Sequence, residues 1–256
     1  MITEEQIKQI DNRYKDICLL ASKDDSYFNT FKSHPDYNVI LEHVSYEMGK
    51  EYYYHCLNVN KQIFDNKGID VMKKIDSLGS PRRYFYDGIG HISPTMLRYY
   101  SVMGDIERLY GSLDNKTIVE IGAGYGGQSM MIQLYHDIKK YVIVDLPEVI
   151  ELIKTFLKKN NVDLSRYEFH SFPNIPEIES DFLISNYAFS ECPKSVQDVY
   201  IDSLINKTKS FYMIINFMGG KFYTKEELVS KINGEIIITK EQPPINDVNI
   251  LFYKGK

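Results

Sequence analysis

The chain has 256 residues, enough for one large domain or two small ones with a core that needs no disulfide bonds. Hydrophobic residues make up 43% and charged residues 25%, which is typical of globular proteins and excludes collagen-like, coiled-coil and wholly disordered chains. The net charge of −5 weighs against general binding to phosphate backbones, so we expect no nucleic-acid partner.

The first 112 residues carry helical and irregular patterns. Apolar residues recur at helical spacing from residue 3 to residue 20. Further helices are predicted over residues 37–58, 68–78 and 94–110. Glycine and proline interrupt the stretches between them, so loops are expected at residues 79–84 and 87–94. We interpret residues 1–112 as a helical N-terminal region.

From residue 113 onward, short apolar runs alternate with amphipathic stretches. Strands are predicted at residues 117–121, 141–144, 167–170, 182–185, 211–215, 235–239 and 249–253. Helices are predicted at residues 128–137, 147–159, 193–205 and 224–232. This alternation favours a parallel sheet with helices on both faces. The last two strands have no helix between them and are expected to be antiparallel, so the fold class is α/β with a mostly parallel, seven-stranded Rossmann-like sheet.

The strongest chemical signal is the segment IVEIGAGYGGQS at residues 118–129. Its glycines at 122, 124 and 126 follow a strand and precede a helix, where a side chain would keep a ligand away from the backbone and the helix N-terminus. Asp145 ends the next strand, and a carboxylate there can accept both hydroxyls of a ribose. The pattern predicts a nucleoside-cofactor site at the carboxyl edge of the sheet, with a tight turn that binds nothing as the alternative.

The glycine spacing separates two classes of cofactor. Dinucleotide dehydrogenases use G-x-G-x-x-G, whereas this chain has G-x-G-x-G, preceded by Glu120. The segment resembles the first signature of class I S-adenosylmethionine-dependent methyltransferases, and the resemblance covers residues 113–256 with the final antiparallel pair. It implies the class I methyltransferase fold, S-adenosylmethionine as cofactor, and a catalytic domain at residues 113–256.

The same resemblance implies roles for individual residues. Glu120 matches the acid associated with the methionine end of the cofactor, Asp145 matches the ribose acid, and Leu146 would lie beside the adenine. Ser171 and Phe172 fall where the family binds the adenine edge, although many members have an acid there. The expected cofactor-binding set is Glu120, Gly122, Ala123, Gly124, Tyr125, Gly126, Asp145, Leu146, Ser171, Phe172 and Asn186.

A looser resemblance covers the whole chain and concerns the acceptor. The helical first part, the stretch SPRRYFYDGIGHISPTMLRYY and the segment ISNYAFSECP resemble the sugar O-methyltransferases of bacterial surface-polysaccharide clusters. This resemblance implies an acceptor that is a sugar, or an activated or phosphorylated precursor of a capsule or other surface glycan. Residues 1–112 would then form the acceptor pocket and its lid.

Methyl transfer to a hydroxyl needs alignment of three atoms and removal of a proton. The residues after the fourth strand face the methyl group in this fold; they lack the N-P-P-Y signature of amide and adenine N-methyltransferases. Asn186 is not an acid of the kind that holds magnesium in catechol-type enzymes, so no metal is predicted. The candidate catalytic residues are Tyr187, His91 in a glycine- and proline-flanked loop, and Glu191. A surface histidine and a helix-terminal acid are the alternatives for the last two.

Basic and aromatic residues before the glycine segment are the candidates for acceptor binding. Arg82, Arg83 and Arg98 are expected to clamp a phosphate, with solvated surface charge as the alternative. Tyrosines suit a polar, ring-shaped substrate. The alternative is an AT-rich coding bias that favours tyrosine, with the rings used in packing. The tyrosines expected to stack on a sugar ring are Tyr84, Tyr86, Tyr99 and Tyr100.

Other features bear on location and partners. Cys18, Cys56 and Cys192 are too few and too scattered for a disulfide framework or a cysteine-type zinc site, and indicate free thiols in a reducing compartment. The first residues lack the apolar segment of a signal peptide, and no apolar run approaches the roughly 20 residues of a membrane span. We expect a cytoplasmic chain without a membrane span, and a homodimer is left open.

The leading interpretation is an S-adenosylmethionine-dependent O-methyltransferase acting on a small-molecule or sugar-type acceptor. One alternative changes the acceptor to a phosphate-type oxygen or a small non-sugar metabolite; a phosphate oxygen is already anionic and needs no base. A nicotinamide-dependent oxidoreductase is a second alternative, against which the glycine spacing weighs. A non-catalytic partner subunit is a third, against which the presence of Glu120, the glycines and Asp145 weighs.

Overall fold

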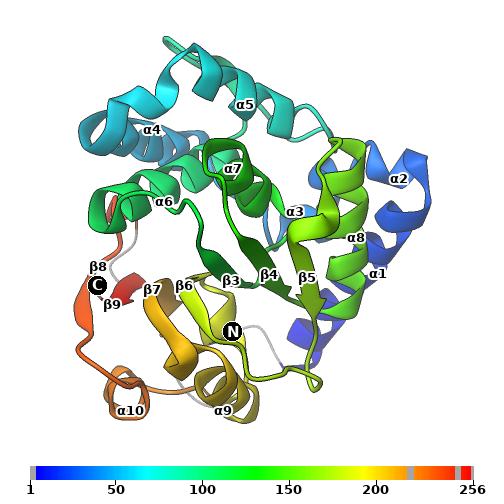
Figure 1. Cartoon of the computed structure of the whole chain (residues 1–256). Helices are drawn as coiled ribbons and strands as arrows, with labels where there is room; N and C mark the ends of the chain where they lie inside the picture. Colours follow the sequence, from blue (N-terminus) through cyan, green and yellow to red (C-terminus); the bar gives the residue numbers. More distant parts are fainter. Residues whose placement is uncertain (1–3, 218–221, 246–248, 255–256) are drawn as a thin grey trace. The chain divides into compact units, whose positions relative to one another are not determined.

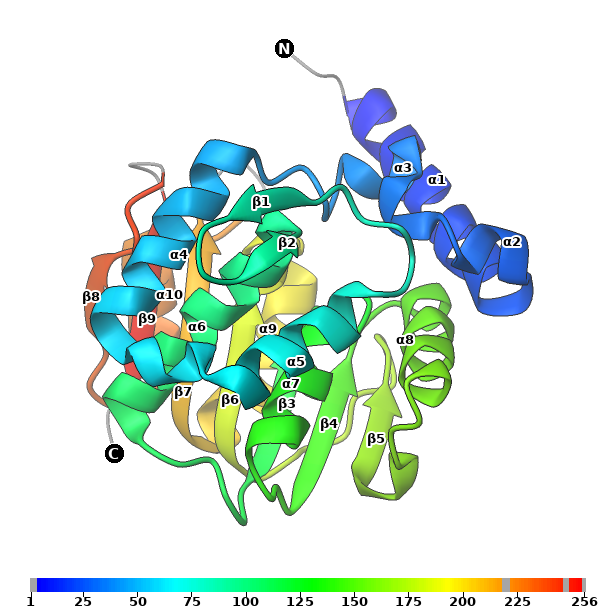
Figure 2. The same cartoon turned by 90° about the horizontal axis from the view of Figure 1, so that it is seen from above.

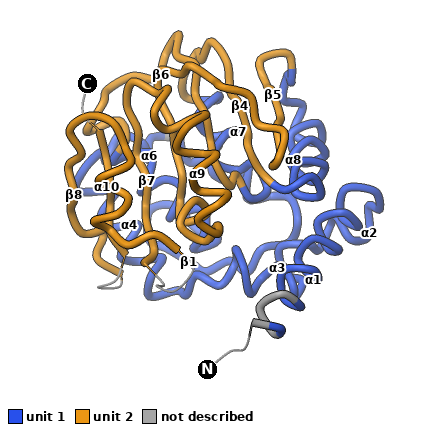
Figure 3. Tube along the Cα trace, turned by 90° about the horizontal axis from the view of Figure 1, so that it is seen from below, with its two compact units in different colours: residues 1–105, 124–134, 146–164 blue, residues 106–123, 135–145, 165–256 orange. Residues whose placement is uncertain are grey.

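The computed structural model describes residues 4–217, 222–245 and 249–254. The chain forms two compact units, each made of several segments (Figure 3). Unit 1 comprises residues 1–105, 124–134 and 146–164, and unit 2 comprises residues 106–123, 135–145 and 165–256. The two units are defined by how compactly their segments pack, and not by function. The predicted boundary near residue 112, between an acceptor-binding region and a catalytic domain, stays a prediction.

A seven-stranded sheet forms the centre of unit 2. Its strands are β3 (Thr117–Ile121), β4 (Lys140–Val144), β5 (Tyr167–His170), β6 (Ser180–Asn186), β7 (Thr208–Asn216), β8 (Ile237–Lys240) and β9 (Asn249–Lys254). The strands lie in the order β5-β4-β3-β6-β7-β9-β8 (Figure 1). The first five are parallel, and β9 is antiparallel to both β7 and β8. The predicted sheet of the class I methyltransferase fold, mostly parallel with an antiparallel last strand, is confirmed.

The core of unit 2 lies between the sheet and two helices, α9 (Lys194–Ser203) and α10 (Lys225–Lys231). Tyr200 and Ile201 of α9 and Leu228 of α10 belong to the same buried cluster as Val119 and Ile121 of β3. The central strands are apolar at nearly every position because parallel strands are buried on both faces. Short 3₁₀ segments connect these elements: η3 (Leu164–Arg166), η4 (Ala188–Glu191) and η5 (Ile205–Lys207).

Unit 1 contains most of the helices. They are α1 (Glu4–Lys23), α2 (Asp25–Phe28), α3 (Pro35–Asn38), α4 (Tyr46–Asn60), α5 (Asn66–Asp76) and α8 (Pro147–Lys159), with the 3₁₀ segments η1 (Phe31–Ser33) and η2 (Lys61–Phe64). Two further helices, α6 (Pro94–Tyr110) and α7 (Gly127–Tyr135), begin in unit 1 and end in unit 2. Among the described helices, none combines the length and the apolar character needed to cross a membrane.

Helix α8 packs along α1 within unit 1, although about 125 residues separate them in the sequence. The Thr155 hydroxyl on α8 donates a hydrogen bond to the carbonyl of Ser22 at 3.2 Å. Apolar residues of α8 recur at helical spacing and are buried, as the sequence predicts. The predicted bounds 147–159 of this helix are confirmed.

Two predictions for the first 112 residues are wrong. The single helix expected at residues 37–58 is divided, because Ser45 caps a new helix by accepting a hydrogen bond from the amide of Met48 at 3.2 Å. The expected loops contain a hairpin of β1 (Tyr84–Tyr86) and β2 (Gly90–Ile92), whose turn uses positive φ angles at Gly88 and Gly90. Figure 2 shows this hairpin.

The capping box that begins α10 gives a test of the fold of unit 2. The Thr224 hydroxyl accepts a hydrogen bond from the amide of Glu227, and the Glu227 carboxylate accepts one from the amide of Thr224. We expect Thr224→Ala to lower the free energy of unfolding by about 1 kcal/mol, measured by urea denaturation. Ser230→Ala removes an exposed hydroxyl from the same helix and is the control, with a change below about 0.5 kcal/mol. Equal losses in both variants would contradict this role of the cap.

Candidate functional site

The sheet of unit 2 has a topological switch point between β3 and β6, because successive connections leave these neighbouring strands in opposite directions. In open α/β sheets, ligands bind outside the carboxyl ends of the strands at such a point. Gly122 follows β3, Asp145 follows β4, and Asn186 ends β6. The fold of unit 2 therefore brings these three predicted residues to one edge of its sheet. Figure 1 shows the neighbouring strands β4, β3 and β6.

Gly122 occupies a position that no other residue fits. Its φ is +77°, and a Cβ atom there would lie 2.0 Å from the Cβ of Ala188, in the segment that follows β6. The Ser185 hydroxyl holds that segment in place: it donates to the carbonyl of Ile121 at 3.1 Å and accepts from the amide of Phe189 at 3.2 Å. The ends of β3 and β6 thus approach so closely that Ala188 fills the space that a side chain at residue 122 would need.

Glu120 is a buried carboxyl group near the end of β3, with 2% of its surface exposed. Burial raises the pKa of Glu120 to about 8, and the charge of Asp145 adds to this rise. The hydrogen bond that Glu120 accepts from the Tyr141 hydroxyl at 2.7 Å opposes the rise. The carboxyl group is therefore largely protonated at neutral pH. A cationic group bound nearby would favour the ionised form.

Asn186 carries an unsatisfied polar atom at the same edge. Its Oδ1 is buried and has no hydrogen-bond partner among the described residues. Buried polar atoms are nearly always paired, so an exception calls for a specific cause such as a ligand. Asp145, on the neighbouring strand end, is half-buried, and its amide donates to the carbonyl of His170 at 3.2 Å. The edge thus combines two acids, one orphan acceptor and a glycine with a positive φ angle.

Tyr187 follows β6 directly and has a strained backbone with φ +70°. Such strain persists only where the surroundings impose it, and it concentrates at functional sites. The Tyr187 hydroxyl donates a short hydrogen bond to Glu241, which is 1% exposed and also accepts from the Nδ2 of Asn249 at 2.7 Å. The sequence analysis missed Glu241 and Asn249, because no local pattern indicates a contact across 54 residues.

Three other predicted residues of unit 2 lie near strand ends. Ser171 and Phe172 follow β5, and the Phe172 side chain is 44% exposed. Glu191 is exposed at the end of η4, three residues before α9, so it lies outside the first turn of that helix. Nothing in the structure tests the roles expected for these residues.

The second part of the glycine segment belongs to unit 1. Gly124 and Gly126 have φ angles of +60° and +85°, and a Cβ at either would lie about 3 Å from Leu41 or Ile153, respectively. The Tyr125 side chain is fully buried, so only its backbone can face a ligand. Leu146, immediately before α8, is 40% exposed.

The predicted acceptor residues all lie in unit 1. The Arg83 guanidinium is bound to the Asp76 carboxylate with an Nε–Oδ2 distance of 3.1 Å, and Arg82 lies 5.1 Å from the ring centre of Tyr84. His91 is exposed on β2, and its ring centre lies 5.4 Å from that of Phe85. Arg98 is 7% exposed, so solvated surface charge is wrong for this residue.

Stacking on a sugar is wrong for three of the four tyrosines. Tyr86, Tyr99 and Tyr100 are at most 5% exposed, and the Tyr100 hydroxyl donates to the carbonyl of Gly68 at 2.8 Å. These rings pack in the core, which was the alternative interpretation. Only Tyr84 is accessible enough to contact a ligand.

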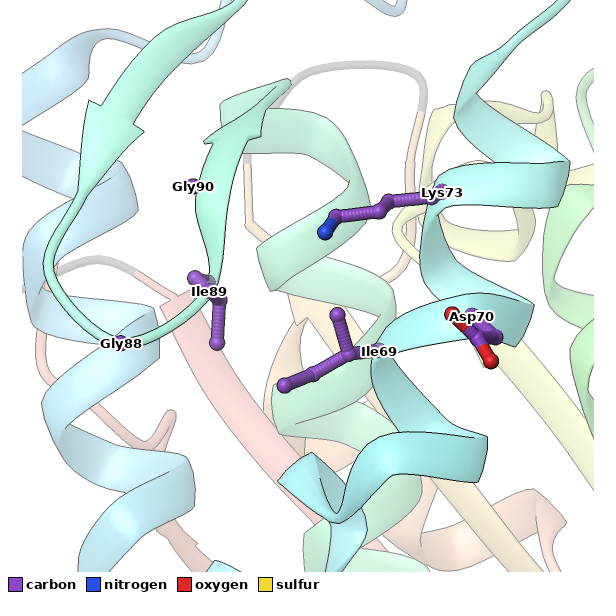
Figure 4. A pocket seen from close by; sticks show the side chains of 6 residues that line it. All are labelled: Ile69, Asp70, Lys73, Gly88, Ile89 and Gly90. Carbon is purple, nitrogen blue, oxygen red and sulfur yellow. The ribbon is translucent and has the colours of Figure 1, made fainter.

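Unit 1 also contains a pocket between α5 and the β1–β2 hairpin, with a volume of about 590 Å³. Figure 4 shows Lys73 reaching from α5 toward the hairpin. The lining residues are Ile69, Asp70, Lys73, Gly88, Ile89 and Gly90. None of them belongs to the predicted site.

Comparison with known proteins adds a fold likeness. The sequence matches no family model and no curated protein. Among solved structures, the chain is similar to a SAM-dependent methyltransferase from Aquifex aeolicus (16% identity, 60% of this chain and 87% of that chain, TM-score 0.42). It is also similar to the PH0226 protein from Pyrococcus horikoshii OT3 (13% identity, 62% and 90%, TM-score 0.48). Similarities this distant say nothing about the function of this chain. The residues of the candidate site carry that inference.

Glu120 gives a pH-dependent test of the site. A carboxyl group with a raised pKa contributes its full stability below the unfolded value of 4.5, and this contribution is lost as pH rises through about 8. Glutamine keeps the size and the acceptor without the titration. We therefore expect the Tm of Glu120→Gln, relative to wild type, to increase from pH 5 to pH 8 by about 2 °C or more, measured by calorimetry.

The control for this experiment is Glu168→Gln on β5. Glu168 is 46% exposed on its side chain, and the hydrogen bond from Lys140 lowers its pKa. The Tm of Glu168→Gln, relative to wild type, should not increase from pH 5 to pH 8. A Tm difference for Glu120→Gln that is flat with pH would mean that Glu120 is ionised in the unliganded protein.

Proposed function

We propose that this protein is an S-adenosylmethionine-dependent methyltransferase. The observation that carries the proposal is the edge of the unit 2 sheet, where Glu120, Gly122 and Asp145 lie on neighbouring strand ends at the switch point. The residues fit the cofactor, because two acids suit its ammonium and its ribose hydroxyls. When bound, S-adenosylmethionine supplies an activated methyl group.

The proposed roles of the residues follow their chemistry. Asp145 accepts the ribose hydroxyls, and Glu120 accepts the ammonium at the methionine end of the cofactor. A bound cation would offset the burial that keeps this carboxyl group protonated, so we expect the pKa of Glu120 to fall when the cofactor binds. The remaining proposed contacts are Ala123, Gly124, Tyr125, Gly126, Leu146, Ser171, Phe172 and Asn186.

For the acceptor, we propose a hydroxyl group of a sugar or of an activated sugar precursor of a surface glycan. A hydroxyl must lose a proton during the transfer. Tyr187, joined by its hydroxyl to the buried Glu241 after β8, supplies a path for that proton from the switch point along the carboxyl edge of the sheet. Arg83 is engaged with Asp76, which weakens the case for a phosphate clamp. His91 and Glu191 remain alternative bases.

The cofactor assignment is tested by calorimetric titration with S-adenosylhomocysteine. We expect wild type to bind it and Asp145→Ala to bind about 30-fold more weakly, since charged hydrogen bonds to the ribose are worth about 2 kcal/mol. Asp181→Asn, at the opposite end of β6, is the control and should bind as wild type does. A parallel titration with NAD should give no heat. Binding of NAD in place of S-adenosylhomocysteine would support the oxidoreductase alternative.

The acceptor class is tested with S-adenosylmethionine that carries a labelled methyl group. We expect label in nucleotide sugars or neutral saccharides, and none in non-sugar alcohols or phosphate monoesters that lack a sugar. With the best acceptor, Tyr187→Phe should lower kcat by about 100-fold or more, because the proton path is interrupted. His91→Ala and Glu191→Gln should each retain most of the activity. Full activity of Tyr187→Phe would transfer the role of base to one of those two residues.

A further inference from the structure

Lys32 is a fully buried lysine in unit 1, at 0% exposure. Its ammonium lies 3.8 Å from the ring centre of Tyr125, 5.1 Å from that of Phe156 and 5.9 Å from that of Phe31. The carbonyl of Ile75 accepts its long hydrogen bond at 3.5 Å. The nearest ring face therefore belongs to the tyrosine of the glycine segment, 93 residues later in the chain.

Burial and the neighbouring carboxylates act in opposite directions on the pKa of Lys32. Burial lowers its pKa, and the carboxylates of Glu42 and Asp76 raise it again, while Arg83 opposes them. Glu42 and Asp76 are themselves 8% and 1% exposed. A cation and its counter-charges kept out of water add little net stability, so their presence calls for another role.

Tyr125 occupies a decisive place in the glycine segment. It lies between Gly124 and Gly126, both with positive φ, and its ring covers Gly127 so closely that a Cβ there would lie 2.5 Å from the ring. The position of the ring therefore fixes the path of the backbone on both sides. The Tyr125 hydroxyl has no hydrogen-bond partner among the described residues. Ring packing and the Lys32 ammonium hold this side chain.

We propose that Lys32 is a positioning residue for the glycine segment. By binding the face of Tyr125, its ammonium keeps the backbone at Gly124–Gly127 in the conformation that receives the cofactor. The proposed effect on affinity rests on the proposed function. The effect on the segment itself does not.

Two variants separate the loss of the Lys32 ammonium from the effect of leaving a buried carboxylate without its counter-charge. Lys32→Met removes the ammonium and keeps an apolar chain of similar length. Lys32→Met combined with Glu42→Gln also removes the carboxylate that would otherwise be left without its counter-charge. Tyr100→Phe is the control, because it deletes a buried hydrogen bond to Gly68 in the same unit without touching the glycine segment.

The first readout is hydrogen exchange of the Met130 amide, which donates to the carbonyl of Gly126 at 3.0 Å, in the protein without ligand. We expect both Lys32 variants to exchange at least tenfold faster there than Tyr100→Phe does, once the three are compared at equal global stability. Since this readout needs no cofactor, it tests the positioning role of Lys32 even if the proposed function is wrong. Exchange at the control rate in the double variant would overturn the proposal.

The second readout is the Kd for S-adenosylhomocysteine. We expect a rise of about tenfold or more in both Lys32 variants and a value within about twofold of wild type in Tyr100→Phe. If wild type does not bind S-adenosylhomocysteine, the proposed function fails. If wild type binds and the Lys32 variants bind equally well, the inference about Lys32 fails alone.

Discussion

The close approach of two strand ends is the constraint on which the candidate site depends. A Cβ on Gly122 would overlap Ala188, so the segment after β6 can lie against the end of β3 only because residue 122 has no side chain. Ser185 joins the two ends by hydrogen bonds on both sides of the contact. The strained Tyr187 and Asn186, with its orphan oxygen, lie in the chain between Ser185 and Ala188, which form this junction.

Each unit of the molecule buries an ionisable side chain. Glu120 in unit 2 and Lys32 in unit 1 are both removed from water, and burial disfavours the charged form of each. Neither is the arrangement that stability alone would select, because apolar residues of similar size would pack without that cost. Both residues are linked to the glycine segment: Glu120 precedes Gly122 by two residues, and the Lys32 ammonium contacts the ring of Tyr125.

Much of the sheet could be predicted because its signals are local. Runs such as residues 117–121 and the helix at residues 147–159 show their apolar periodicity directly, and the capping box at Thr224 marks a helix start. The secondary structure of the first 112 residues was harder to predict. Ser45 interrupts a pattern that tyrosines already blur, and the glycines that indicate a loop also build the turn of a hairpin.

The sequence by itself determined the order of strands and helices from residue 117 onward, the glycine segment, and the acids Glu120 and Asp145, because each depends on residues close together in the chain. Only the tertiary structure decided which tyrosines are core, that Glu241 binds Tyr187, and that Lys32 lies on Tyr125. Those contacts join residues dozens of positions apart. They arise from the packing of whole elements, on which local periodicity carries no information.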